Sequence, residues 1–256
     1  FSRRVSTIYL PDRRRPMLPT ILSDTLCSLQ EKQDRFALAM TFFVTTDGMI
    51  DTSRTQYKNA LIRVRKNFRY EEVKLVVNNE HYHNLFNLST LMDKSIKNSH
   101  DVVAHWMVQM NAHTGLNMVD RKIGIFRSAV FKNADKEIQT LDGVELHEDT
   151  RRVIKSWNNT TGQYIAYSDT TNLNHDMLDT RSFKQSNYSK SASRPYIHIT
   201  SPIRRLIDLL NQIILFKNYN LVTDLSNDAL NFVLDWTQKL DYINATMRSI
   251  RKTQTD

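Results

Sequence analysis

Hydrophobic positions along the chain follow two different spacings, and each predicts a kind of element. Residues 36–44 form an apolar run that is followed by an Asp-Gly pair at residues 47–48, which predicts a buried strand closed by a tight turn. Residues 49–64 are expected to supply the returning strands. Aliphatic residues and arginines alternate over residues 62–65, which is the period of a strand with one buried face.

Helical spacing dominates the rest of the chain. Residues 71–98 are expected to form two helices around a polar loop, and the His81–His83 pair in that loop lacks the partners that a metal site needs. A longer helix is expected to begin at Ser99, a residue type that caps helices well. The remaining expected elements are a helix at residues 149–157, a polar loop at residues 183–194 and a last helix at residues 227–251.

One stretch, residues 196–209, changes from extended to helical within a few positions. Its sequence is Tyr-Ile-His-Ile-Thr-Ser-Pro-Ile-Arg-Arg-Leu-Ile-Asp-Leu. Pro202 suits a first helical turn because its missing N–H is no loss there, and a hydroxyl at residues 200–201 can cap the helix. Arg204 and Arg205 would then lie at a helix N-terminus, where a positive charge is unfavourable for folding.

The arginine pair of this stretch has two interpretations, and the sequence leaves both open. Two guanidinium groups, exposed N–H groups and the hydroxyl of Ser201 together make a good site for a phosphate. Alternatively, both arginines pair with carboxylates elsewhere in the fold.

Composition narrows the class of protein. The chain has 256 residues, of which 40% are hydrophobic, with only five glycines and five prolines, so it suits one large folded domain or two small ones. A single cysteine, Cys27, excludes a disulfide framework and a cysteine-based zinc cluster, and suits a reducing intracellular compartment. The net charge of +8 favours a polyanionic partner, with nucleic acid ahead of a membrane surface. No apolar run approaches the ~20 residues of a membrane span.

The stretch at residues 196–209 resembles the signature of the RNase II/RNase R family, the RNB-domain 3′→5′ exoribonucleases. Residues 6–29, which contain Tyr-Leu-Pro-Asp-Arg, Pro-Met-Leu-Pro and Leu-Cys-Ser-Leu, resemble the other long motif of that family. The resemblance implies an α+β fold, a mixed sheet with flanking helices like that of the RNB catalytic domain. It also implies that residues 1–256 are the C-terminal two-thirds of a single RNB-like domain, without the OB-type and S1-type domains of the family.

The resemblance assigns roles to five residues. Arg204 matches the arginine that stabilises charge during phosphodiester hydrolysis, and is the expected catalytic residue. Ser201 and Arg205 are candidate holders of an RNA phosphate. Tyr9 matches a tyrosine that packs against RNA and helps to select ribose, although on composition alone residues 3–15 read as a solvated basic loop. Tyr70 lies close to the position where the family has an aromatic residue that clamps RNA, and it is the candidate for that role in this chain.

The family holds Mg²⁺ with clustered aspartates in the spacing Asp-x₅-Asp-x-Asp-Asp, and this chain has no such pattern. Asp12, Asp24 and Asp208 are isolated in sequence. No metal ligand is therefore assigned within the chain, and the Mg²⁺ ligands are expected upstream of Phe1. The lead-in to the signature departs from the family. The positions after it depart as well, because Leu206, Gln212 and Ile213 replace residue types that the family usually has there. Near residues 244–246 there is no clear match to a glutamate that the family often has in its last helix.

Two functions follow from this pattern. The first is a processive 3′→5′ exoribonuclease that hydrolyses single-stranded RNA with Mg²⁺, for which this chain supplies the arginine and part of the RNA channel. The second is a catalytically inactive RNB-like protein that binds RNA or assists assembly. A weaker resemblance to divergent mitochondrial members suggests an RNA helicase or a larger ribonucleoprotein as a partner. It also suggests the mitochondrial matrix as the location, with the cytosol and the nucleus as alternatives. No membrane association is expected.

Overall fold

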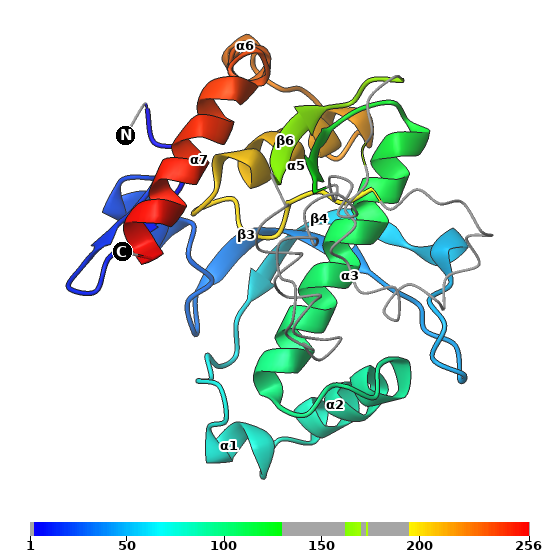
Figure 1. Ribbon diagram of the computed structural model, residues 1–256. Coiled ribbons are helices and arrows are strands. Elements are labelled where there is room, and N and C mark those ends of the chain that lie inside the picture. The colour runs from blue at the N-terminus through cyan, green and yellow to red at the C-terminus, as the bar shows by residue number, and fades with distance from the viewer. Residues whose placement is uncertain (1–2, 130–161, 170–172, 174–194, 256) are drawn as a thin grey trace, which may run out of the picture.

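The computed structural model describes residues 3–129, 162–169, 173 and 195–255, which form an α+β fold (Figure 1). The helix expected at residues 149–157 and the loop expected at residues 183–194 lie outside the described residues. The described helices are α1 (Val73–Val76), α2 (Glu80–Met92), α3 (Ser99–Asp120), α5 (Leu206–Asn218), α6 (Asn227–Gln238) and α7 (Leu240–Thr255), with a π-helical turn η1 (Ile21–Leu26) and a 3₁₀ turn η2 (Thr52–Arg54).

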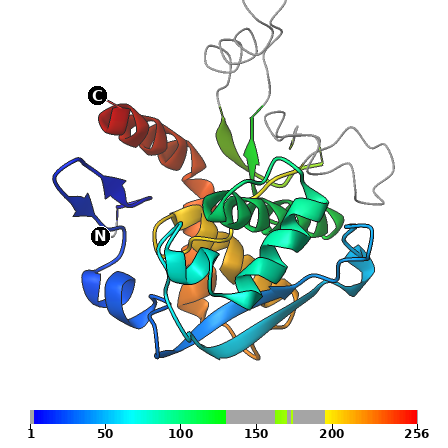
Figure 2. The ribbon, with the colours of Figure 1, turned by 90° about the horizontal axis from the view of Figure 1, so that it is seen from below.

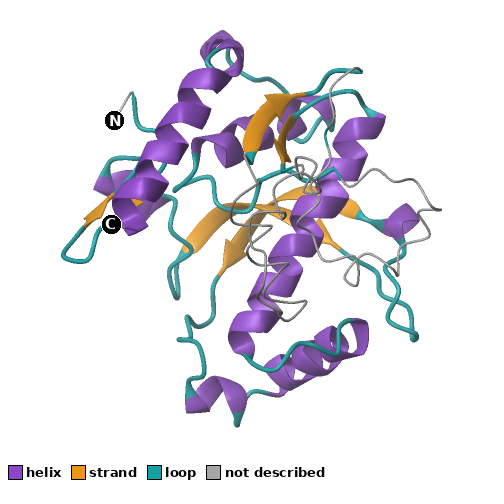
Figure 3. Ribbon diagram, viewed as in Figure 1, coloured by secondary structure: helices purple, strands orange, loops and turns teal. Residues whose placement is uncertain are grey.

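The strands pair as three two-stranded antiparallel ribbons. These are β1 (Ile8–Tyr9) with β2 (Arg14–Arg15), β3 (Asp34–Thr41) with β4 (Gln56–Arg63), and β5 (Ile125–Ser128) with β6 (Gln163–Ala166). Figure 3 shows them as short ribbons among the helices. The α+β class is confirmed, while the described strands pair only antiparallel, in separate ribbons, where a mixed sheet was expected.

The β3–β4 hairpin is as long as predicted but less buried. Its closing turn contains Gly48, whose φ of +83° favours glycine and whose N–H donates to the Thr45 carbonyl at 3.0 Å. Phe36 and Leu61 face each other across the ribbon, and their side chains are 87% and 65% exposed. The prediction of a buried strand over residues 36–44 is therefore wrong, because an apolar run does not reveal whether another element covers it.

Helix α3 runs through the centre of the molecule, and α1 and α2 lie at one end of it (Figures 1 and 2). Its N-cap is Asn98, whose side chain accepts from the Asp101 N–H at 2.9 Å. Ser99, the predicted cap, is buried in the first turn, where its hydroxyl donates to Glu71. The two helices expected within residues 71–98 are present as α1 and α2, but His81 and His83, which were expected in the polar loop between them, lie in the first turn of α2, because Asn79 caps that helix.

The C-terminal region contains two helices where one was expected. Helix α6 ends at Gln238, and Lys239 leaves helical geometry with its N–H bonded to the Trp236 carbonyl at 3.1 Å. No proline or glycine marks this break, so the sequence pattern did not show it. Helix α7 then turns back along the molecule and contacts β6 and β1 (Figure 1).

Two hydrophobic clusters hold these elements together. One joins α5 and α7 to the ribbons, and its buried members are Val5, Met17, Ile125, Tyr164, Leu206, Ile207, Leu210, Ile243 and Ile250. The other joins α3 and α5 through the extended segment at residues 197–199, with buried members Met118, Phe126, Leu173, Ile197, Ile199 and Leu215. Both clusters include α5, so the signature stretch leads into a helix that is shared by both parts of the core.

The buried histidine of α3 gives the fold a measurable pH dependence. His113 is 4% exposed against the ring of Phe42, and burial lowers its pKa to about 4. The unfolded chain takes up this proton near pH 6.5, so the free energy of unfolding should fall between pH 6.5 and 4, by up to about 3 kcal/mol. We expect urea denaturation to show this fall and His113→Gln to reduce it. An unchanged pH profile in that variant would contradict the assignment.

Candidate nucleic-acid interface

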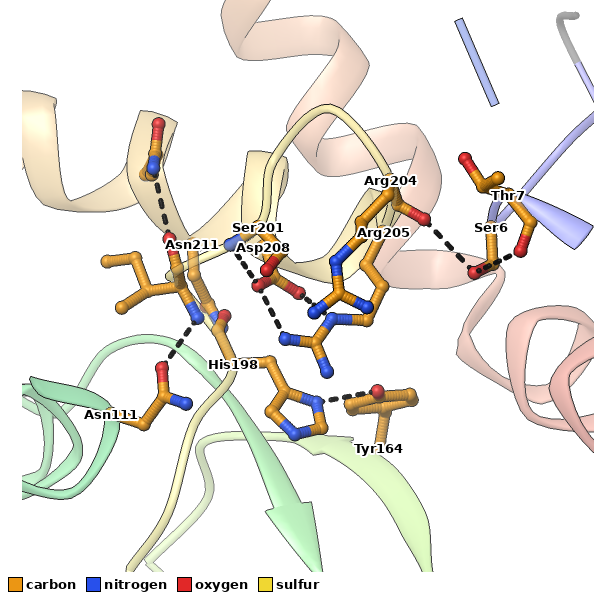
Figure 4. A network of polar contacts seen from close by, with 12 residues as sticks. Ser6, Thr7, Asn111, Tyr164, His198, Ser201, Arg204, Arg205, Asp208 and Asn211 are labelled. Carbon is orange, nitrogen blue, oxygen red and sulfur yellow. Dashed lines mark hydrogen bonds and ion pairs between the residues drawn. The ribbon is translucent and has the colours of Figure 1, made fainter. Parts of the chain in front are cut away.

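Two segments about 200 residues apart in sequence meet at the candidate site. The Thr7 N–H and the Ser6 hydroxyl both donate to the Arg204 carbonyl, at 2.9 and 3.0 Å. The Leu206 N–H donates to the Val5 carbonyl at 2.9 Å, and Ser6 bridges Arg205 in an antiparallel sense. The two motifs at residues 6–29 and 196–209 are therefore joined by main-chain contacts, and Figure 4 shows the contact of the Ser6 hydroxyl with the Arg204 carbonyl.

The chain between Ser201 and Arg205 forms a tight turn rather than the start of a helix. The Ser201 carbonyl accepts from the N–H groups of Arg204 and Arg205, both at 3.1 Å. Arg205 is extended, with φ −137° and ψ 126°, and α5 begins at Leu206 without a side-chain cap. The predicted helix start at Pro202 is wrong, because the contact between Leu206 and Val5 keeps Arg205, the residue before α5, extended.

A buried carboxylate holds this turn in place. Asp208 is fully buried, and its Oδ1 accepts from the Ser201 N–H at 2.7 Å and from Arg205 Nη2 at 3.0 Å. Arg205 Nε lies 2.9 Å from Asp208 Oδ2. Burial raises the pKa of Asp208, and the neighbouring arginine and the Ser201 N–H oppose that rise. For Arg205 the structure thus favours an ion pair with a carboxylate.

Arg204 differs from its neighbour, because its guanidinium makes no hydrogen bond or ion pair with any described residue. The residue is exposed at the wall of a groove of about 520 Å³. Ser201 lines the same groove, as do Leu29 and Phe36 from the region of the first motif. Thr200 also lines it and keeps a buried hydroxyl that has no partner among the described residues. Arg204 is therefore available to an anion that enters this groove.

The two aromatic residues assigned to RNA are exposed but lie outside the lining of this groove. Tyr9 is 48% exposed on β1, two residues from the contact of Thr7 with Arg204. Tyr70 is 56% exposed, and its ring packs on His100 at a centroid distance of 5.0 Å, near the start of α3. Both side chains are partly exposed, and their roles with RNA stay predictions.

Buried asparagines orient the extended lead-in to the signature, and sequence reasoning missed them. Asn111 on α3 accepts from the Ile199 N–H at 3.1 Å, and Asn211 on α5 donates to the His198 carbonyl at 3.0 Å. Asn211 also accepts from the Ile125 N–H at 2.9 Å. These amides replace sheet partners for the irregular backbone. An asparagine at helical spacing gave no signal of this role.

A second group of site residues lies on the β5–β6 ribbon. Tyr164 is opposite Arg127 in the ribbon, its hydroxyl lies 2.7 Å from His198 Nδ1, and the Arg127 Cζ lies 5.2 Å from its ring centroid. Burial raises the pKa of Tyr164, and Arg127 and Arg205 oppose that rise. Figure 4 places Tyr164 and His198 next to the Arg205 guanidinium. No sequence motif marked Tyr164.

The described residues do not fit a Mg²⁺ site. Within them, no three side chains of histidine, cysteine, aspartate or glutamate gather closely enough to hold a metal ion. The acid nearest to the arginine pair, Asp208, is already used by Arg205 and Ser201. The expectation that Mg²⁺ ligands come from outside this part of the chain stays a prediction. None of the described helices is both long and apolar enough to cross a membrane.

Comparison with known proteins shows which proteins the chain resembles. Residues 1–107 match the RNB domain, and ribonuclease R of Chlamydia pneumoniae is 26% identical over 268 residues, which cover 84% of this chain and 39% of that protein. The chain is thus similar to proteins of the RNase II/RNase R family, over residues 1–107 for the RNB domain. It spans less than half the length of this relative.

Solved structures agree on the RNB-type fold. Mycoplasma genitalium RNase R in complex with ribose-methylated single-stranded RNA superposes with a TM-score of 0.71 at 20% identity, over 99% of this chain and 48% of that one. Yeast Ssd1, described as a pseudonuclease, superposes with a TM-score of 0.63 at 13% identity, over 94% of this chain and 36% of that one. The fold is thus shared by a nuclease and by a relative described as a pseudonuclease.

Loss of the buried carboxylate tests how the turn of this RNB-type chain is held. Asp208→Ala leaves the largely buried Arg205 and the Ser201 N–H without their acceptor, so we expect the free energy of unfolding to fall by about 3 kcal/mol in urea denaturation. The pair variant Arg205→Met/Asp208→Leu should recover part of that loss, because no buried charge is left alone. A loss below about 1 kcal/mol for Asp208→Ala would contradict this role.

Proposed function

We propose that this chain forms the arginine-bearing, RNA-binding part of a 3′→5′ exoribonuclease that acts on single-stranded RNA. The observation that carries the proposal is Arg204, an exposed guanidinium without a partner among the described residues, fixed at a groove where the two RNB motifs meet. The net charge of +8 favours a polyanion at this surface. The similarity to an RNase R that was solved with single-stranded RNA supports RNA as the ligand.

Arg204 can bind a phosphate through two parallel N–H donors, which an exposed lysine cannot do. Charge that develops on the phosphate oxygens during hydrolysis would be stabilised by such a fixed cation. The Ser6 hydroxyl and the Thr7 N–H both donate to the Arg204 carbonyl, so the backbone that carries the guanidinium is held in place. Arg205 contributes through its ion pair, which shapes the turn, and Ser201 supplies a hydroxyl at the same wall.

A second candidate function is RNA binding without hydrolysis. Residues 244–246 showed no clear match to the family glutamate, and Asn244 instead bonds both main-chain groups of Tyr164, at 2.7 and 2.9 Å. The chain is therefore without an acid at that position, and its fold is shared with the pseudonuclease Ssd1. Under this alternative the groove retains RNA and leaves it intact. Processivity, a Mg²⁺ requirement, a helicase or ribonucleoprotein partner and a mitochondrial location stay parts of the proposal.

Substitution of Arg204 tests the proposed function. We expect Arg204→Ala to slow the shortening of a 3′-tailed single-stranded RNA at least ~100-fold and to leave the melting temperature unchanged, since the guanidinium has no partner to lose. Arg54→Ala is the matched control, because Arg54 is an exposed arginine that lies on Phe43 at 3.9 Å in the hairpin loop. It removes the same charge and should leave shortening unchanged.

The same assay separates the two candidates. An exoribonuclease reduces the tailed RNA to a small end product in the presence of Mg²⁺. A protein that only binds leaves the RNA full length but retains it in a complex that weakens as salt rises. Equal activity of Arg204→Ala and Arg54→Ala would contradict the catalytic role of Arg204, and absence of any RNA complex would contradict both candidates.

A further inference from the structure

The groove beside Arg204 has an apolar side and a polar side. Strand β3 supplies apolar side chains, Phe36 and Leu38, and Met110 of α3 adds a third. The turn before α5 supplies Ser201 and Arg204. Ligand sites typically combine a mostly apolar surface with a few placed polar groups in roughly 300–1,000 Å³, and this groove of about 520 Å³ lies within that range.

Phe36 is the lining residue whose position the packing of the fold does not explain. Leu38 packs against the second hydrophobic cluster, and Phe36 lies two residues earlier on the same face of β3. The Phe36 side chain is 87% exposed. Among the described residues no other aromatic ring or cation packs on it. A large aromatic ring that stays in water at a groove is stabilised when a flat apolar group covers it.

Gln212 adds a fixed hydrogen-bonding group to the same groove. Its Nε2 donates to the Ile199 carbonyl at 3.0 Å, and its amide oxygen has no partner among the described residues. The groove therefore offers an exposed ring, an amide acceptor and, at Arg204, a cation without a partner in the described part of the chain. A nucleotide carries the matching groups, which are the flat face of a base, the N–H groups at its edge and a phosphate.

We infer that this groove is a subsite for one nucleotide, whose base stacks on Phe36 while its phosphate binds Arg204. The inference rests on the proposed function for the source of the nucleotide, which is a strand of RNA. It adds to that function the side chain that holds a base. The subsite should tolerate all four bases, because stacking uses only the flat face and the Gln212 oxygen finds an N–H donor on the edge of each.

The first test compares adenosine 5′-monophosphate with ribose 5-phosphate, which has the same sugar and phosphate but no base. In NMR titrations the 256-residue chain should bind the nucleotide about tenfold more tightly, since stacking of one base on an aromatic ring has about this effect. Phe36→Leu keeps an apolar side chain without the ring and should abolish the difference, whereas Phe36→Trp should keep it. Arg204→Ala should weaken the binding of both ligands.

Leu61→Ala is the matched control. Leu61 faces Phe36 across the ribbon and is 65% exposed, but it does not line the groove. Its loss removes an exposed apolar side chain from the same hairpin and should leave both affinities unchanged. The Phe36 variants and Leu61→Ala should melt at the temperature of the unchanged chain, because these side chains are mostly in water.

The second test uses single-stranded RNA in fluorescence anisotropy over a series of salt concentrations. Phe36→Leu should weaken binding about tenfold and leave the slope of log K against log salt unchanged, because stacking releases no counterions. Arg204→Ala should reduce that slope by about 0.7, as loss of one phosphate contact does. The salt slope thus distinguishes the residue that holds the base from the residue that holds the phosphate.

The outcomes separate this inference from the proposed function. If the chain binds RNA through Arg204 but Phe36→Leu matches Leu61→Ala with every ligand, the inference is overturned while the proposed function stands. If the chain binds the mononucleotide through Phe36 and retains no RNA, the subsite is confirmed for a free nucleotide and the proposed function fails. If Phe36→Leu instead dissociates a dimer in light scattering and nucleotide binding does not change, the ring belongs to a protein interface and the inference is overturned.

Discussion

The ion pair between Arg205 and Asp208 is the constraint from which the geometry of the candidate site follows. It is largely buried, with side-chain exposures of 16% and 0%, so both charges have given up most of their water. Such a pair is costly to build and more costly to break from one side. Asp208 also accepts a hydrogen bond from the Ser201 N–H, so one carboxylate holds both ends of the turn that carries Arg204.

The rest of the site depends on that turn. Because Asp208 forms an ion pair with Arg205, the two adjacent arginines differ. Arg205 stabilises the turn, and Arg204 faces the groove. The N-terminal segment at residues 5–7 then binds the end of the turn, because the Thr7 N–H donates to the Arg204 carbonyl and the Leu206 N–H donates to the Val5 carbonyl. A phosphate at Arg204 would therefore meet a cation whose backbone is already ordered, so that little further ordering is needed on binding.

Much of this arrangement could be predicted from sequence, and the failures have physical reasons. The motifs at residues 6–29 and 196–209 predicted the family and the placement of Arg204 at a surface. The helices within residues 71–120 followed from apolar spacing and polar caps. The start of α5 was placed four residues early, because the contact of Leu206 with Val5 is a tertiary contact that no local pattern shows. Arg127 and Tyr164 were missed for a similar reason, since their contacts with each other and with His198 join segments that lie far apart in the sequence.

The account is tested most directly by a double-variant cycle of RNA affinity between Arg204 and Asp208. If the carboxylate shapes the turn that presents Arg204, then Arg204→Ala should weaken RNA binding in the unchanged chain but have little further effect in an Asp208→Ala background that is still folded by circular dichroism. The cycle cancels the extra positive charge that loss of Asp208 brings. Equal losses from Arg204→Ala in both backgrounds would show that Arg204 acts independently of the buried pair, and would contradict the account.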